Sequence, residues 1–230
     1  MPSIQPSLFR AVLCACCLLC GSATAQVHKP TTITGSDWGS KPQPIPDDRR
    51  HTPKFVTLHH AGVIWKGDRT PIQFIRNMQV WGQNEKNWPD LPYHFLIAPD
   101  GNIYEGRSLD FEPESNTKYP LAGNIGVEMM GHFGEQRPSP EQLASAARLT
   151  AWLCQEYKIA PTRANIRGHK DAAPGQTSCP GEDFQRYLDD GKFITWVKAL
   201  LAGKEVRIEP GPPLPNGPTA PIPTATTRPS

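Results

Sequence analysis

The pattern of apolar and polar positions predicts strands that alternate with helices. Short apolar or alternating runs bounded by turn residues are typical of strands. Apolar residues spaced three or four apart behind a Thr-Pro or Ser-Pro pair are typical of helices with a capped first turn. Strands are expected at residues 54–58, 93–98, 102–105 and 124–130, the second and third forming a hairpin. Helices are expected at residues 71–81, 140–160, 182–188 and 192–202.

Two flanking segments lack these patterns. Residues 26–53 are polar and Pro-rich, and they predict an extended N-terminal segment whose Trp38 packs onto the body. Residues 207–230 hold eight of the 26 prolines among Thr and Gly, a composition that predicts a disordered tail. The 230 residues therefore leave one domain, at residues 54–206, which is long enough for a sizeable core.

The first 25 residues have the pattern of a secretory signal peptide. Arg10 is followed by the apolar run 11–20 and by Ala23-Thr24-Ala25, a small-residue cleavage site before Gln26. The run is too short to span a bilayer, which needs about 20 residues, so no transmembrane segment is expected. A lipoprotein signal is the alternative, because Leu13-Cys14-Ala15 precedes Cys16. We expect a periplasmic or extracellular protein.

Export changes how the cysteines are interpreted. Four of the six lie in the first 25 residues, so the exported chain keeps Cys154 and Cys179. An oxidising compartment allows a disulfide between them. Cys154 lies on the apolar side of a predicted helix, which favours a buried free thiol and leaves Cys179 available for a metal.

A loop rich in Gly and Pro, residues 167–181, sets His169 and Cys179 ten positions apart. His59 and His60 end the first predicted strand, and alternation sends their side chains to opposite faces without deciding which is the ligand. Two His and one Cys would hold zinc with one coordination position open, as in catalytic zinc sites. Taken singly, each of these residues is more often structural.

Further candidates surround this set. Glu128 lies in the middle of a predicted strand, where a buried carboxylate near a metal would serve as a general acid or base. The alternative is an edge-strand glutamate facing water. The hydroxyls of Tyr93 and Thr177 are candidates to stabilise an oxyanion. A nucleophilic Cys179–His169 pair is a competing chemistry, although Cys179 follows both candidate histidines in the chain.

Several segments together resemble a known family, in order from about Ile33 to Phe184. This family is the zinc-dependent N-acetylmuramoyl-L-alanine amidases of type 2, which share a fold with peptidoglycan recognition proteins. The segments are Asp37-Trp38-Gly39, Leu58-His59-His60-Ala61, Tyr93-His94-Phe95-Leu96-Ile97, Asp100-Gly101, Tyr104-Glu105-Gly106-Arg107, Asn124-Ile125-Gly126-Val127-Glu128, Gly168-His169 and Cys179-Pro180-Gly181.

The resemblance implies an α/β fold: a single domain with a mixed central sheet flanked by helices. It also implies that His59, His169 and Cys179 hold Zn²⁺ and that Glu128 activates the bound water. Cys179, Thr177 and Tyr93 are similar to the recognition-protein branch, whereas Glu128 and the spacing of the loop at residues 167–181 are similar to the bacterial recycling branch.

The function implied is hydrolysis of the amide between N-acetylmuramic acid and L-alanine, with peptidoglycan or a muropeptide as the partner. The alternative on the same fold is a non-catalytic peptidoglycan-binding protein, which typically lacks the final Cys ligand. Nucleic acid is not expected, because the chain after residue 25 carries only 23 − 22 = +1 charge and has no basic block.

Overall fold

A six-stranded mixed sheet forms the centre of the computed structural model, which describes residues 26–225. The strand order is β1-β4-β3-β5-β2-β6, and only β3 and β4 pair antiparallel. The sheet confirms the expected mixed α/β fold, whereas the signal-peptide prediction lies outside the described residues. The strands are β1 (Thr32–Ile33), β2 (Phe55–His60), β3 (Phe95–Ile97), β4 (Ile103–Glu105), β5 (Asn124–Met129) and β6 (Ile166–Gly168).

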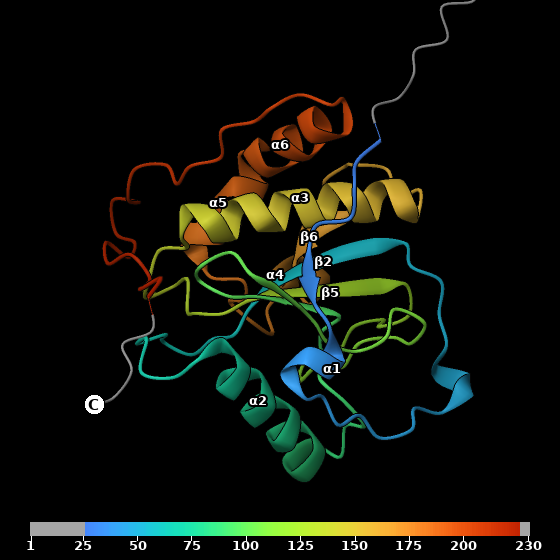
Figure 1. The fold of residues 1–230 in the computed structure, drawn as a ribbon. Helices are drawn as coiled ribbons and strands as arrows, with labels where there is room; N and C mark the ends of the chain where they lie inside the picture. Colours follow the sequence, from blue (N-terminus) through green and yellow to red (C-terminus); the bar gives the residue numbers. More distant parts are fainter. Residues whose placement is uncertain (1–25, 226–230) are drawn as a thin grey trace, which may run out of the picture.

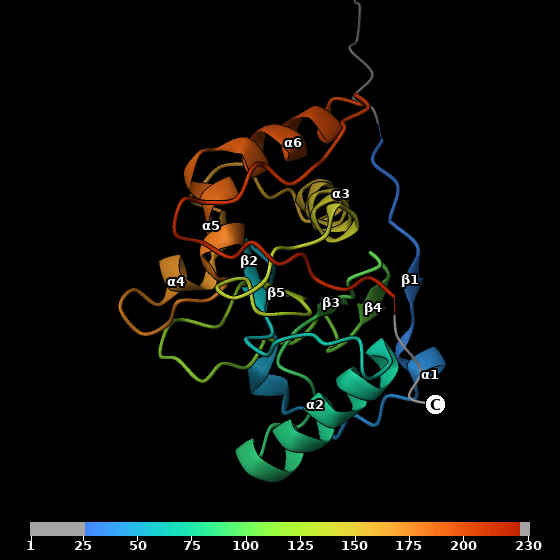
Figure 2. The same cartoon turned by 90° about the vertical axis from the view of Figure 1, so that its left-hand side faces the viewer.

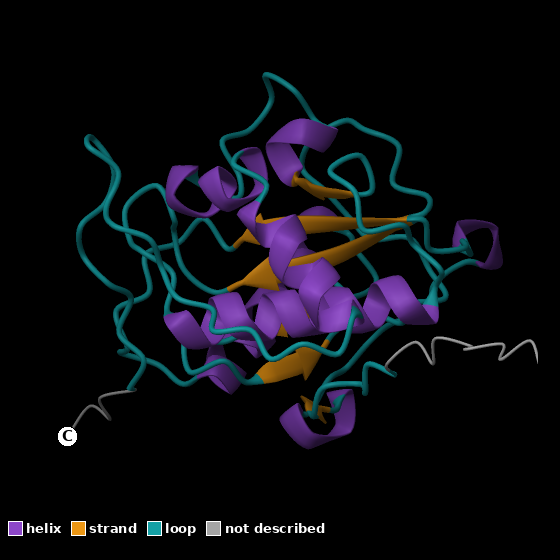
Figure 3. Ribbon diagram, turned by 90° about the horizontal axis from the view of Figure 1, so that it is seen from above, coloured by secondary structure: helices purple, strands orange, loops and turns teal. Residues whose placement is uncertain are grey.

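Helices cover both faces of this sheet (Figures 1 and 3). In Figure 1, α3, α5 and α6 lie on one side and α2 on the other. The predicted helix caps Thr70 and Ser139 are both present, each forms a capping box, and each is followed by Pro in the first turn. The helices are α1 (Gly35–Trp38), α2 (Pro71–Lys86), α3 (Pro140–Glu156), α4 (His169–Ala172), α5 (Glu182–Asp189) and α6 (Lys192–Leu201), with a 3-10 turn η1 (Asp47–Arg49).

Helix α2 continues past the predicted end at Trp81-Gly82. It reaches Lys86 and ends at Asn87, whose φ of 54° is left-handed. Gly82 is buried, and a Cβ there would lie 3.2 Å from the Trp88 ring. The glycine therefore makes room for an aromatic side chain, and this packing outweighs its low helix propensity, which is worth about 1 kcal/mol.

The N-terminal segment is more structured than the extended chain that the sequence predicts. Thr34 and Asp37 cap the short helix α1 reciprocally, and β1 adds a parallel edge strand to β4. Trp38 is fully buried, and its Nε1–H donates to the Glu105 carbonyl at 2.7 Å. The expected packing of Trp38 on the body is thus confirmed.

The C-terminal segment contradicts the predicted disordered tail as far as the structure describes it. Residues 209–225 run back along the body from α6 (Figure 2). The Arg137 backbone donates to Ala220 and accepts from Ile222, whose side chain is buried. Prolines lack an N–H, but the neighbouring Ala220 and Ile222 can still form these backbone hydrogen bonds. The buried Ile222 side chain holds the segment to the body, and composition alone does not reveal such a contact.

The sheet determines where the candidate residues gather. Strands β2, β5 and β6 are parallel neighbours, so their carboxyl ends meet at one edge. His59 lies near the end of β2 and pairs in register with Glu128 of β5, while His169 directly follows β6. No helix among residues 26–225 is long and apolar enough to cross a membrane.

Candidate metal centre

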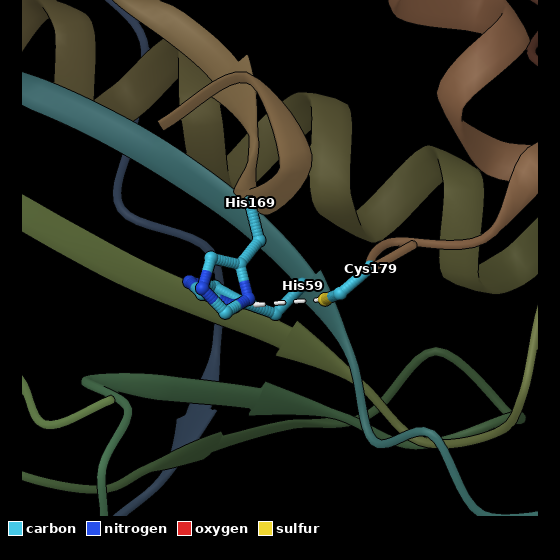
Figure 4. A group of neighbouring side chains, drawn as sticks. All are labelled: His59, His169 and Cys179. Atoms are coloured by element: carbon cyan, nitrogen blue, oxygen red, sulfur yellow. Dashed lines mark hydrogen bonds between the residues drawn. The ribbon is translucent and has the colours of Figure 1, made fainter. Parts of the chain in front are cut away.

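His59, His169 and Cys179 converge at this edge of the sheet (Figure 4). His59 comes from β2, His169 begins α4 after β6, and Cys179 lies on the loop that leads to α5. One ligand atom from each lies within 4.8 Å of the others, and Cys179 Sγ is 3.7 Å from His59 Nδ1. All three side chains are buried, as expected of ligands that exclude water from one side of a metal.

The structure separates the two consecutive histidines. The His59 ring lies 4.5 Å from the His169 ring and 4.9 Å from that of Tyr93, between centroids. His60 faces the other way and accepts a hydrogen bond at Nδ1 from the Phe133 backbone at 3.0 Å. Strand alternation therefore places His59, and not His60, in the ligand group.

The protonation preferences of this group suit a metal. Burial lowers the pKa of His59 well below 6.5 and that of His169 to about 4, so both imidazoles are neutral with a lone pair available. Burial also raises the pKa of the Cys179 thiol to about 12. A thiol held in that state is a poor nucleophile, which argues against the Cys179–His169 peptidase, whereas a metal would stabilise its thiolate.

The donor set fits a zinc ion. Two imidazole nitrogens and one sulfur are ligands of catalytic zinc sites, in which a fourth position stays open. Cys179 is available for this role because Cys179 and Cys154 are both free thiols. The disulfide alternative is therefore wrong: Cys154 is held in the core by α3.

A cavity of about 660 Å³ opens over the three ligands. Helix α2 and Trp88 form one wall, and residues 114–117 contribute to another. Tyr93 and Thr177, the two candidate hydroxyl residues, both line it. The Thr177 hydroxyl also accepts a hydrogen bond from the Cys179 N–H at 3.0 Å, which fixes the turn before the ligand.

Glu128 lies outside the cavity wall and is fully buried in β5, between β2 and β3. The edge-strand alternative is therefore wrong. Neither carboxylate oxygen has a hydrogen-bond partner among the described residues, and burial raises the pKa of Glu128 well above 4.5. Such a group requires a proton, a water or an ion as its partner.

Two residues that contact His169 were not among the candidates predicted from the sequence. Thr117 Oγ1 lies 2.6 Å from His169 Nε2, and Ser115 Oγ lies 3.3 Å from it. Both belong to the irregular stretch 106–123, which has no periodicity to identify individual side chains. Its length was the available signal, because long loops in compact domains are often functional.

The model of the family described as N-acetylmuramoyl-L-alanine amidase (Amidase_2) matches residues 49–182, more than half of the chain. The chain belongs to this amidase family. The match includes the three candidate ligands together with Tyr93, Glu128 and Thr177. Membership confirms the family resemblance drawn from the sequence motifs.

Similar proteins include both recognition proteins and an amidase. Peptidoglycan-recognition protein SD of Drosophila simulans is 31% identical over 162 residues, covering 65% of this chain and 80% of that protein. The crystal structure of Drosophila peptidoglycan recognition protein SD gives a TM-score of 0.62 at 26% identity, over 70% of this chain and 94% of that one. The N-acetylmuramoyl-L-alanine amidase LysC of Clostridium intestinale shares the fold, with a TM-score of 0.56 at 24% identity over 71% and 97% of the two chains.

Proposed function

We propose that this protein is a zinc-dependent hydrolase that cleaves the amide between N-acetylmuramic acid and L-alanine in peptidoglycan or muropeptides. The observation that carries the proposal is the meeting of His59, His169 and Cys179 on the floor of an open cavity. Membership of the amidase family supports the bond type.

His59, His169 and Cys179 would hold the zinc ion. When bound, zinc polarises a carbonyl and lowers the pKa of a water to about 7. The hydroxyls of Tyr93 and Thr177, on the cavity wall, donate hydrogen bonds to the carbonyl oxygen as negative charge develops there. Glu128 is the proposed base, and its carboxylate takes up a proton.

The position of Glu128 makes its role distinct from that of the wall residues. It lies behind the cavity wall, so it reaches the substrate only through a group held between them. Burial raises the pKa of Glu128 well above 4.5 and so favours its protonated form, and a nearby metal cation would favour the carboxylate that can take up a proton.

Two measurements on the purified protein test the proposal: zinc content and release of stem peptides from sacculi. We expect about one zinc per chain and free peptides with an L-alanine N-terminus. Cys179→Ala should lose both zinc and cleavage, because it removes the one sulfur ligand. A Cys179→Ala protein that kept its zinc and its activity would refute the assignment. Cys154→Ala is the matched control and should keep both.

The names of the relatives favour one alternative, a recognition protein that binds peptidoglycan without cutting it. Binding to sacculi with no peptide release, at full zinc occupancy, would establish that alternative.

A thiol peptidase is the other alternative, and it predicts inhibition by an alkylating agent even in the zinc-loaded protein. The zinc mechanism predicts inhibition by a chelator instead.

We also infer that the protein acts outside the cytoplasm. The signal pattern in residues 1–25 and the proposed cell-wall substrate support this inference. Expression of the full chain, followed by N-terminal sequencing of the exported product, should give Gln26 as the first residue.

A further inference from the structure

Two hydroxyl groups from the segment between β4 and β5 lie against one nitrogen of His169. Thr117 Oγ1 is 2.6 Å from Nε2 and Ser115 Oγ is 3.3 Å from it. The two hydroxyls are 2.9 Å apart, and Ser115 Oγ accepts a hydrogen bond from the Thr117 backbone at 3.1 Å. Nε2 is therefore engaged, and Nδ1 is the ring nitrogen left for another partner.

The segment that carries Thr117 is fixed at both ends. On one side, the Gln176 side chain accepts from the Lys118 N–H at 2.8 Å and donates to the Lys118 carbonyl at 2.9 Å. On the other side, Glu114 pairs with Arg49 and, at 3.2 Å, with the buried Arg107. The Gln176 contacts tie Lys118 to the loop that also supplies Cys179, and the Glu114 ion pairs hold the other end of residues 114–118 to the body.

A neutral imidazole that ligates a metal through one nitrogen carries its proton on the other. The group that accepts this proton's hydrogen bond fixes both the tautomer and the orientation of the ring. A threonine hydroxyl can accept from Nε2–H and still donate its own proton, and Ser115 Oγ lies 2.9 Å away as an available acceptor. The Thr117 hydroxyl thus has the chemistry and the distance that this role needs.

We propose that Thr117 is a positioning residue of the metal centre, which holds the His169 ring with Nε2 protonated and Nδ1 free to bind zinc. Gln176 supports it by clamping the backbone of Lys118. This inference rests on the proposed zinc function, because it assigns no role to Thr117 without a metal at His169.

The first test measures zinc affinity by competition with a chromogenic chelator. Thr117→Val keeps the shape and removes the hydroxyl, and loss of such an outer partner weakens metal affinity by about 10- to 100-fold. Thr117→Ser should restore the wild-type affinity, and Gln176→Ala should weaken it less than Thr117→Val does. Thr150→Val is the matched control: Thr150 is fully buried in α3, its hydroxyl has no partner among the described residues, and its removal should leave zinc affinity unchanged.

The second test reads the tautomer of His169 by nitrogen NMR in the zinc-free protein. Wild type should show Nε2 protonated, and Thr117→Val should show a mixture of the two tautomers. Equal zinc affinities in wild type and Thr117→Val, or an Nδ1-protonated ring in wild type, would overturn the positioning role while the zinc function stands. A wild-type protein that binds no zinc would overturn the proposed function itself.

Discussion

Glu128 and Tyr93 carry the two proposed catalytic roles, and substitutions can separate them. Glu128→Gln keeps the volume of the side chain but removes its ability to take up a proton. We expect kcat to fall by about 10²- to 10⁴-fold, the usual contribution of a general base. Zinc content should be unchanged, because Glu128 is not a member of the ligand group. Peptide release from a defined muropeptide, measured by mass spectrometry, gives the rate.

Tyr93→Phe isolates the hydroxyl on the cavity wall, since its ring packs against His59 in either case. Removing one oxyanion donor costs about 10²- to 10³-fold in kcat. Tyr104→Phe is the control, because Tyr104 is buried in β4 away from the cavity and should keep full activity. An active Glu128→Gln enzyme together with an inactive Tyr93→Phe enzyme would assign the proton transfer to Tyr93 instead.

At the scale of elements, local sequence signals predicted most boundaries of the helices and strands. Thr70-Pro71 and Ser139-Pro140 mark helix starts because capping depends on residues only three positions apart. The approach of His59 to His169 and Cys179 was predicted from ligand chemistry and from the family motifs. Strand β1 and the end of α2 were missed because long-range partners decide them: β4 for β1, and Trp88 for Gly82.

At the C-terminal segment, the prediction from composition differs most from the structure, because the segment was expected to be disordered and its described part is ordered. Asp183 is fully buried between Arg137 and Arg186, at 3.6 and 3.2 Å. Both arginines also donate to the Gly211 carbonyl. The ordered path of the segment thus depends on contacts with residues some 25 to 75 positions away in the sequence. Proline content says nothing about such partners.

Ile222 tests this path. Ile222→Ala removes a buried side chain that lies beside Gly131 and Phe133, so we expect the free energy of unfolding to fall by about 2–4 kcal/mol. Thr219→Ala, at an exposed position of the same segment, should change it by less than about 0.5 kcal/mol. Urea unfolding followed by circular dichroism measures both. If the segment were disordered in solution, the two substitutions would have equally small effects.

At the scale of the whole molecule, His94 links three distant parts of the chain. Its Nδ1 accepts from the Gly126 N–H of β5 at 2.9 Å, and its Nε2–H donates to the Phe111 carbonyl at 2.9 Å. The ring is buried and directly precedes β3. A proton on Nδ1 would point at the Gly126 N–H, so the folded protein holds this histidine neutral.

This arrangement predicts acid sensitivity of the fold. Burial lowers the pKa of His94 from 6.5 to about 3 in the folded protein, while the unfolded chain keeps the ordinary value. The stability contributed by the neutral ring is therefore complete above pH 6.5 and is lost as the pH falls toward 3. His94 contributes about 1.4 kcal/mol per pH unit to the slope, for the one proton that its ring takes up on unfolding. The buried rings of His59, His60 and His169, whose pKa values are also lowered, add to the total slope. Urea unfolding between pH 7.5 and 4 measures the slope, and the zinc-free protein is used so that loss of zinc at low pH does not affect the result.

His94→Gln should reduce the slope, even though it lowers the free energy of unfolding at pH 7.5. His28→Gln, at an exposed position, should keep the wild-type curve. If His94→Gln and wild type lost stability in parallel, the acid sensitivity would belong to other groups.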